Sequence, residues 1–104
     1  MEKFKVVWSK RAANKLFGIY SYVCNEKQEP ISADALCIGL LEFSDKVAST
    51  PNAFPIVARK KRFTYRGANY KKNYKLVFRV NEKTKTVWIA NIFHNKRNPQ
   101  NLLK

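Results

Sequence analysis

The hydrophobic pattern of the first quarter of the chain changes from a two-residue to a 3.6-residue repeat. Phe4, Val6 and Trp8 occupy alternate positions, which predicts a strand over residues 3–8. Ser9 is a suitable N-cap for a following helix. The apolar positions after it recur every three or four residues: Ala13, Leu16, Phe17, Tyr20, Val23 and Cys24. We therefore expect a helix from Ser9 to about residue 25, ended by the polar segment 26–30.

A second helical repeat begins near Ser32 and ends before Thr50 and Pro51. Its apolar stripe is unbroken: Ala33, Leu36, Cys37, Leu40, Leu41, Ser44, Val47 and Ala48. Two amphipathic helices with a short connection predict an antiparallel hairpin. Their apolar stripes need a hydrophobic surface to cover.

The second half of the chain carries strand patterns that can provide this surface. After a loop at 51–55, a basic and aromatic segment predicts a strand over residues 59–66, and residues 67–73 are expected to form a turn. Two clearer strands follow at 74–80 and 86–93, joined by a turn at 81–85, and an irregular tail starts at residue 95. The sequence predicts one α+β domain over residues 1–104. In it, an N-terminal strand and a helical hairpin precede a three-stranded antiparallel sheet.

The last two strands also predict which face of the sheet is covered. If Val80 pairs with Val87, the pairs Phe78/Ile89, Leu76/Asn91 and Tyr74/Phe93 follow on one face, where we expect the helices to pack. The other face then carries Arg79/Trp88, Val77/Ala90, Lys75/Ile92 and Asn73/His94. In this register Lys75 and His94 are diagonal neighbours on a face that is open to solvent.

Charge separates the two halves of the chain and identifies the kind of partner. Residues 1–56 carry seven basic and six acidic groups, a net +1. Residues 57–104 carry fourteen basic groups and one acidic group, a net +13, so the halves sum to the +14 of the whole chain. This asymmetry indicates a polyanionic partner for the second half, either nucleic acid, ribosome or a nucleic-acid enzyme, and it also suits an acidic protein.

The candidate binding residues form a predicted groove on the open face. Lys75, Arg79, His94, Lys96 and Arg97 line this groove, with Arg59, Lys60, Lys61, Arg62 and Arg66 beside it. Such cations can hold a phosphate backbone, while Tyr65, Tyr70 and Trp88 can stack on bases. A simpler interpretation also stays open, in which the cations are only solvated, Trp88 shields the sheet or meets a partner, and His94 is a hydrogen-bonded structural histidine.

Other kinds of chemistry have little support. Cys24 and Cys37 lie in helical patterns and His94 is the single histidine, so no zinc spacing exists, and we expect no metal site and two reduced cysteines. The chain has only three glycines and no Gly-rich phosphate loop, so no cofactor is expected. It contains no signal peptide and no long apolar run, which predicts a cytoplasmic protein that does not enter a membrane.

Three motifs follow one another along the chain in the order of a known protein family. Val6-Val7-Trp8-Ser9, followed by Ala12, is similar to a strand that leads into S-x-x-A. The segment from Asn73 to Val80, which follows Arg66, resembles the pattern NY-x-x-x-Y-R-V, with Phe78 in place of the second tyrosine. His94 and Arg97 match an H-x-x-R ending after the last strand. Together these motifs resemble the RelE/ParE toxins of type II toxin–antitoxin systems, the plasmid-stabilisation type, and the resemblance covers nearly the whole chain.

The resemblance implies a growth-arresting toxin that an acidic antitoxin, encoded beside it, neutralises. ParE-like members poison DNA gyrase, whereas RelE-like members cut mRNA on the ribosome. RNA cleavage needs a base and an acid as well as cations. Here no acidic residue occurs between Asp45 and Glu82 and no tyrosine follows Tyr74, so the glutamate and the C-terminal tyrosine of some family nucleases are absent.

The remaining groups for acid–base chemistry are His94 and a lysine such as Lys60 or Lys61. The sequence therefore favours a ParE-like gyrase inhibitor. A ribosome-dependent mRNA nuclease, with His94, Lys75 and Arg79 as catalytic residues, is the alternative. A non-toxic nucleic-acid-binding module is the third possibility.

Overall fold

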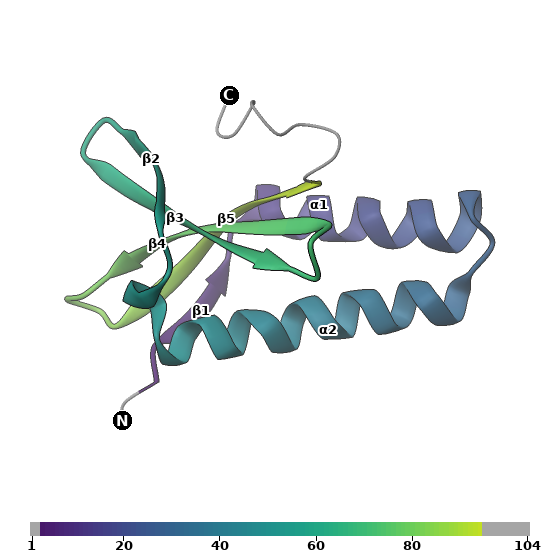
Figure 1. The fold of residues 1–104 in the computed structure, drawn as a ribbon, viewed down its shortest axis with the longest axis horizontal. Coiled ribbons are helices and arrows are strands. Elements are labelled where there is room, and N and C mark those ends of the chain that lie inside the picture. The colour runs from purple at the N-terminus through teal and green to yellow at the C-terminus, as the bar shows by residue number, and fades with distance from the viewer. Residues whose placement is uncertain (1–2, 95–104) are drawn as a thin grey trace.

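The computed structural model describes residues 3–94 as a helical hairpin packed on a twisted five-stranded sheet (Figure 1). The N-terminal strand β1 (Lys5–Trp8) leads into helix α1 (Lys10–Ser21) and a π-helical turn η1 (Tyr22–Glu26). Helix α2 (Pro30–Ser49) runs back beside α1 and is followed by a 3-10 turn η2 (Pro51–Ala53). Strands β2 (Ile56–Lys60), β3 (Phe63–Tyr70), β4 (Tyr74–Asn81) and β5 (Thr86–His94) complete the sheet.

The α+β class and the predicted helical hairpin are confirmed, but the sheet has two more strands than expected. Its order is β1-β5-β4-β3-β2, with β1 parallel to β5 and all other neighbours antiparallel. The single strand predicted over residues 59–66 is wrong, because Lys61 adopts a left-handed φ of 56° and turns the chain between β2 and β3.

The turn predicted over residues 67–73 is shorter than expected, since β3 continues through Gly67 to Tyr70 and leaves residues 71–73 as the turn. Gly67 marks a crowded strand position instead of a turn. A Cβ there would lie 2.8 Å from a methyl carbon of Val57 and 3.1 Å from Cδ of Lys75. A glycine within a strand often marks such a close approach.

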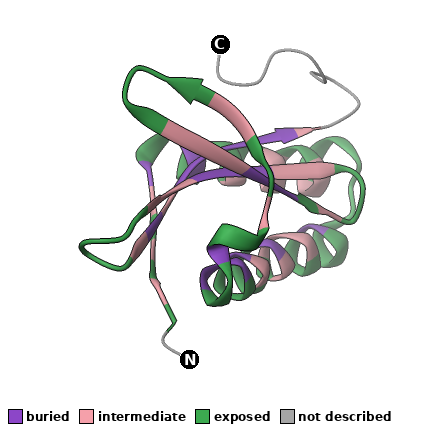
Figure 2. Ribbon diagram, turned by 60° about the vertical axis from the view of Figure 1, so that its left-hand side comes forward, coloured by how far each residue is buried: buried purple, intermediate pink, exposed green. Residues whose placement is uncertain are grey.

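The core lies between α1, α2 and one face of the sheet. Leu76, Phe78, Val87, Ile89 and Ile92 are fully or almost fully buried there. Ala12 of α1 and the end of α2, at Val47 and Ala48, pack against them. Figure 2 shows the same arrangement, with buried residues concentrated in the central strands and exposed residues at the hairpin tips. The helix-facing side of β4 and β5 was thus predicted correctly for Phe78, Leu76, Val87 and Ile89.

A bulge at Ala90 changes the predicted pairing of the last hairpin. Arg79 pairs with Trp88 and Phe78 with Ile89, as expected, but beyond Ala90 the register moves by one residue. Leu76 therefore pairs with Ile92, Lys75 with Phe93 and Tyr74 with His94. Because side chains alternate between the faces of a strand, the extra residue moves every later side chain of β5 to the opposite face.

Ser9 joins this bulge to the start of α1. Its hydroxyl donates a hydrogen bond to the carbonyl oxygen of Ala90 (3.0 Å) and accepts one from the amide of Ala12 (3.0 Å). Its own amide donates to the carbonyl oxygen of Ile89 (3.0 Å). Ser9 therefore acts as the N-cap predicted from the sequence, and it also satisfies a carbonyl at the bulge.

We expect Ser9→Ala to lower the free energy of unfolding by about 2 kcal/mol, because it removes a helix cap and leaves the buried Ala90 carbonyl without its partner. Urea denaturation followed by circular dichroism measures the change. Ser9→Thr keeps the hydroxyl and is the matched control. Equal stability of the alanine variant and the parent chain would show that the two hydrogen bonds are dispensable.

Candidate functional site

The sheet face opposite the core carries the clearest group of aromatic and cationic side chains. We call it the open face and define it by Phe63, Tyr65, Lys75, Arg79 and Trp88. These residues belong to β3, β4 and β5, which the sheet order places side by side. They alternate along their strands with residues that face the helices, so regular strand geometry presents them together.

Arg79 is held between two aromatic rings at the centre of the open face. Its guanidinium carbon lies 4.1 Å from the ring centre of Phe63 and 4.3 Å from that of Trp88. Both distances allow cation–π contact, which Arg makes well because its guanidinium group is flat. Nε of Arg79 is buried and has no hydrogen-bond partner among the described residues. The rings thus fix the position of a charge that makes no ion pair through this nitrogen.

Lys75 lies further along the same strand and is half-buried. Its aliphatic chain passes over Gly67, where the missing Cβ leaves room for Cγ and Cδ. The ammonium group extends from this supported stem, as is usual for a lysine that covers apolar surface. Lys75 and Arg79 therefore share the open face, as the sequence predicted.

His94 does not join these two cations. The bulge at Ala90 places it opposite Tyr74, and the two rings meet edge to face with centres 5.1 Å apart. His94 therefore lies on the helix-facing side of the sheet, and its predicted neighbourhood with Lys75 is wrong. Together with Tyr74, it lines a cavity of about 770 Å³ between α1 and the ends of β4 and β5, which we call the α1 cleft.

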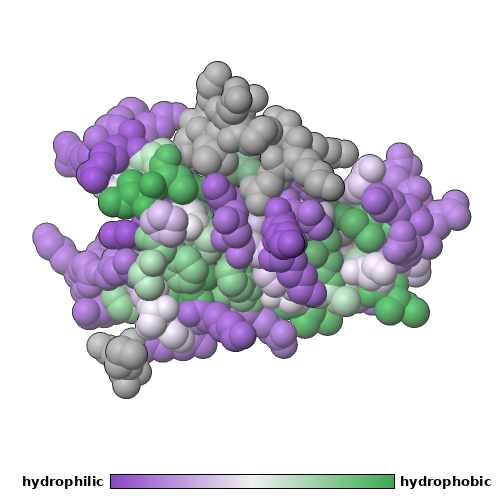
Figure 3. Space-filling model, viewed as in Figure 1, coloured by the Kyte–Doolittle hydropathy of each residue, from purple (hydrophilic) through white to green (hydrophobic). Residues whose placement is uncertain are grey.

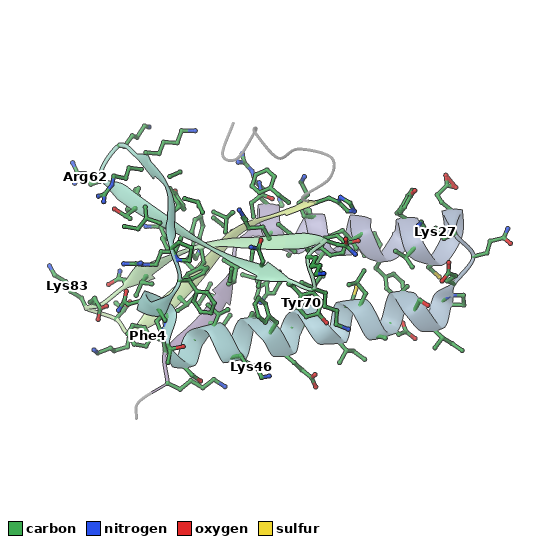
Figure 4. All side chains as sticks on the ribbon, viewed as in Figure 1. Phe4, Lys27, Lys46, Arg62, Tyr70 and Lys83 are labelled. Atoms are coloured by element: carbon green, nitrogen blue, oxygen red, sulfur yellow. The ribbon has the colours of Figure 1, made fainter. Side chains whose placement is uncertain are left out.

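The basic residues around the β2–β3 turn are more dispersed than expected. Arg59, Lys60, Lys61 and Arg62 are exposed at this turn, where the surface is strongly hydrophilic (Figure 3). Figure 4 shows Arg62 at the tip of the hairpin. These cations extend the positive surface beyond Arg79 and the two rings that hold it.

Two other predicted site residues have structural contacts on the helix-facing side. Arg66 donates a hydrogen bond from Nη1 to the carbonyl oxygen of Phe54 (2.7 Å). Tyr70 packs on Phe43, with ring centres 5.2 Å apart, and lies close to Gly39 of α2. The predicted stacking role of Tyr70 is therefore not supported by its position, whereas Tyr65 and Trp88 lie on the open face. Lys96 and Arg97 lie outside the described residues.

The structure adds residues that the sequence pattern did not indicate. A cavity of about 400 Å³ lies between the start of α1 and the open face. Lys10 and Arg11 of α1 line it together with Lys60, Tyr65 and Trp88. No acidic residue occupies the first turn of α1, although carboxylates are favoured at a helix N-terminus. The presence of Lys10 and Arg11 in the first turn of α1 is the one sequence signal that could have indicated a positive surface beside this cavity.

Residues 3–94 contain no cluster of side chains that could bind a metal ion. No group of three histidine, cysteine or carboxylate side chains comes together in this part of the chain. Both cysteines are free, and burial, with a smaller contribution from Asp34, raises the pKa of the Cys37 thiol. Within the same residues, neither helix combines the length and apolar character needed to span a membrane.

Comparison with solved structures finds the same fold in three structures from toxin–antitoxin systems. The chain is similar to a structure from the chromosomal ParDE system of P. aeruginosa, with 20% identity over 88% of this chain and 96% of the other and a TM-score of 0.68. It is also similar to one from the RelBE2 complex of Mycobacterium tuberculosis, with 19% identity over 90% and 93% of the two chains and a TM-score of 0.65.

A third similar structure comes from the archaeal RelE–RelB complex of Pyrococcus horikoshii OT3. Its identity is 19% over 92% of this chain and 99% of the other, with a TM-score of 0.61. These three identities are low, so the structures establish the fold alone. A search of curated proteins found no match.

The sequence itself matches one family model, described as the ParE toxin of the type II toxin–antitoxin system parDE. The match runs from residue 6 to residue 99 and so includes every strand and helix described above except Lys5, the first residue of β1. It agrees with the RelE/ParE resemblance of the three sequence motifs and with the observed fold. The chain therefore belongs to the ParE toxin family of type II toxin–antitoxin systems.

Proposed function

We propose that this toxin arrests growth by inhibiting DNA gyrase, as a binder and not as a nuclease. The observation that carries the proposal is the position of His94, the single histidine of the chain, on the opposite side of the sheet from Arg79 and Lys75. A nuclease needs its proton-transfer groups and its phosphate-binding cations at one substrate. A binder has no such requirement.

The scarcity of other acid–base groups in this half of the chain also supports a binder. Glu82 is the single acidic residue after Asp45, and its carboxylate accepts a hydrogen bond from Asn52 (2.9 Å) in the β4–β5 turn. A second oxygen of the same carboxylate pairs with Lys85 (3.7 Å). Glu82 is thus engaged by Asn52 and Lys85 in the turn between β4 and β5. The match to the ParE family model further supports gyrase as the target.

In this proposal the open face and the basic β2–β3 turn bind the target. Arg79 is fixed by its two rings and presents a charge without reorganisation, which suits recognition of a negative surface. Lys75 and the exposed cations at residues 59–62 add long-range attraction. A ribosome-dependent mRNA nuclease remains the second candidate, because Lys75 and Arg79 also have the arrangement expected of groups that stabilise phosphate charge.

The target is tested by inducing the toxin in bacteria that lack its antitoxin and following two signals in one culture. We expect trapped gyrase–DNA cleavage complexes and unchanged mRNA 5′ ends. New mRNA ends at codon positions with intact DNA would instead identify a nuclease. Growth without either signal would point to a harmless nucleic-acid-binding protein.

Substitutions on the two faces should have different effects. We expect Arg79→Gln to abolish toxicity, because it removes the central charge of the open face, and Arg79→Lys to reduce it, because an ammonium group cannot stack between two rings. His94→Ala should reduce toxicity only partly. Growth after induction and the thermal transition of each purified variant are measured. A loss of toxicity with His94→Ala as complete as that with Arg79→Gln, in folded protein, would favour the nuclease.

We further propose that the partner of this toxin is an antitoxin with an acidic segment, in keeping with the toxin–antitoxin complexes that share its fold. The net +13 of residues 57–104 provides the complementary charge. We expect the association rate constant to fall steeply with salt, because screening weakens long-range steering. Stopped-flow measurements from low to physiological salt test this. An association rate that is insensitive to salt would contradict it.

A further inference from the structure

The α1 cleft has no role in the function proposed above, yet it combines size, charge and aromatic walls. Its volume of about 770 Å³ is in the range of small-molecule sites. One wall is the helical segment from Arg11 to Lys27, about 24 Å long at the rise of an α-helix. The other wall is the edge-to-face pair Tyr74 and His94 at the ends of β4 and β5.

Cations lie at both ends of the helical wall. Arg11 and Lys15 lie near its start and Lys27 at its end, and no carboxylate lines the cleft among the described residues. The ammonium group of Lys15 also lies 5.6 Å from the ring centre of Phe93, a residue of β5 that does not line the cleft, so this charge lies at the border of the cleft. Three positive charges without a lining carboxylate favour a ligand that carries several negative charges.

The π-helical turn η1 determines whether Lys27 or Glu26 lines the cleft at the C-terminal end of its helical wall. The amide of Lys27 donates to the carbonyl oxygen of Tyr22 (3.2 Å), a bond that spans five residues. In a regular α-helix the corresponding donor would be Glu26, four residues after Tyr22. The wider turn therefore brings Lys27, and not Glu26, into the wall with Tyr22. Figure 4 shows Lys27 at the end of the hairpin that is farthest from the sheet.

Gly18 keeps the middle of the cleft open. It lies inside α1, where glycine is unfavourable, and a Cβ built on it meets no atom within 4 Å. Packing between described residues therefore does not require a glycine here. A side chain at this position would instead extend into the cleft, between Arg11 and Lys15 on one side and Tyr22 on the other.

We propose that the α1 cleft is a binding site for a nucleoside phosphate. Such a ligand combines a flat ring, which Tyr22, Tyr74 or His94 can stack against, with phosphates for a cation at one end of the cleft, such as Lys27. An amphipathic peptide fits less well, because the strongly exposed apolar side chains of the hairpin, Phe17, Ile31 and Ile38, lie outside the cleft. The site is independent of the gyrase proposal, although Arg11 of α1 lines both this cleft and the smaller cavity beside the open face.

Calorimetry of the 104-residue chain with ATP, inorganic tripolyphosphate and adenosine tests the proposal. We expect ATP to bind about tenfold more tightly than tripolyphosphate, because its base adds a stacking contact, and more tightly than adenosine, because its phosphates add charge. Absence of ATP binding, or equal binding of tripolyphosphate, would overturn the assignment to nucleoside phosphates. Binding of acidic peptides, but of none of these three compounds, would identify a protein partner instead.

Matched variants locate the binding. Gly18→Phe fills the cleft and should abolish ATP binding, whereas Ala13→Phe adds the same ring to an exposed position of α1 outside it. Lys27→Glu should weaken binding by about tenfold or more, through loss of a charge-assisted contact, while Lys83→Glu makes the same charge change in the distant β4–β5 turn. ATP binding that survives Gly18→Phe, or that falls equally in both charge variants, would show that attraction is unspecific and that the cleft is not the site.

Discussion

The hydrogen bonds of Ser9 are the constraint on which the rest of this structure depends. One hydroxyl caps α1 and satisfies the bulged Ala90 carbonyl, so the direction in which α1 leaves the sheet is coupled to the register of β5. The bulge in turn decides the face on which His94 lies. A serine that looks like an ordinary helix cap in the sequence thus determines which titratable and charged groups are neighbours.

The sequence predicted those features that follow from local periodicity. Both helices, the hairpin between them, strands β4 and β5 and the pairing of Arg79 with Trp88 were recognised because a long amphipathic repeat or a short turn specifies each of them. The division between β2 and β3 was missed because it depends on the left-handed backbone of Lys61, a residue type that gives no turn signal. Gly67 suggested a turn that is not there, because a glycine is needed at this strand position for close contact with Lys75 and not for flexibility.

The candidate site was predicted in part for the same reason. Lys75, Arg79 and Trp88 follow from alternation within one unbroken stretch of strand, and the structure brings them to one face. His94 comes after the bulge, so a count of residues alone assigns it to the wrong side. The contribution of Lys10 and Arg11 depends on how α1 crosses the end of β1, which is a long-range property of the fold. The stacking of Arg79 between Phe63 and Trp88 also joins residues of three strands.

The parallel pairing of β1 with β5 has a consequence for the time at which this toxin matures during its own synthesis. Among the strands of residues 3–94, β1 is made first and β5 last, and Ser9 and Ala90 are separated by 81 positions. At usual elongation rates of roughly 5–20 residues per second, the first strand waits on the order of 4–16 s for its partner. The helical hairpin can form during this delay, but the edge of the sheet cannot. The sheet is thus complete only after β5 has been made, and until then β1 remains available to chaperones or to an antitoxin.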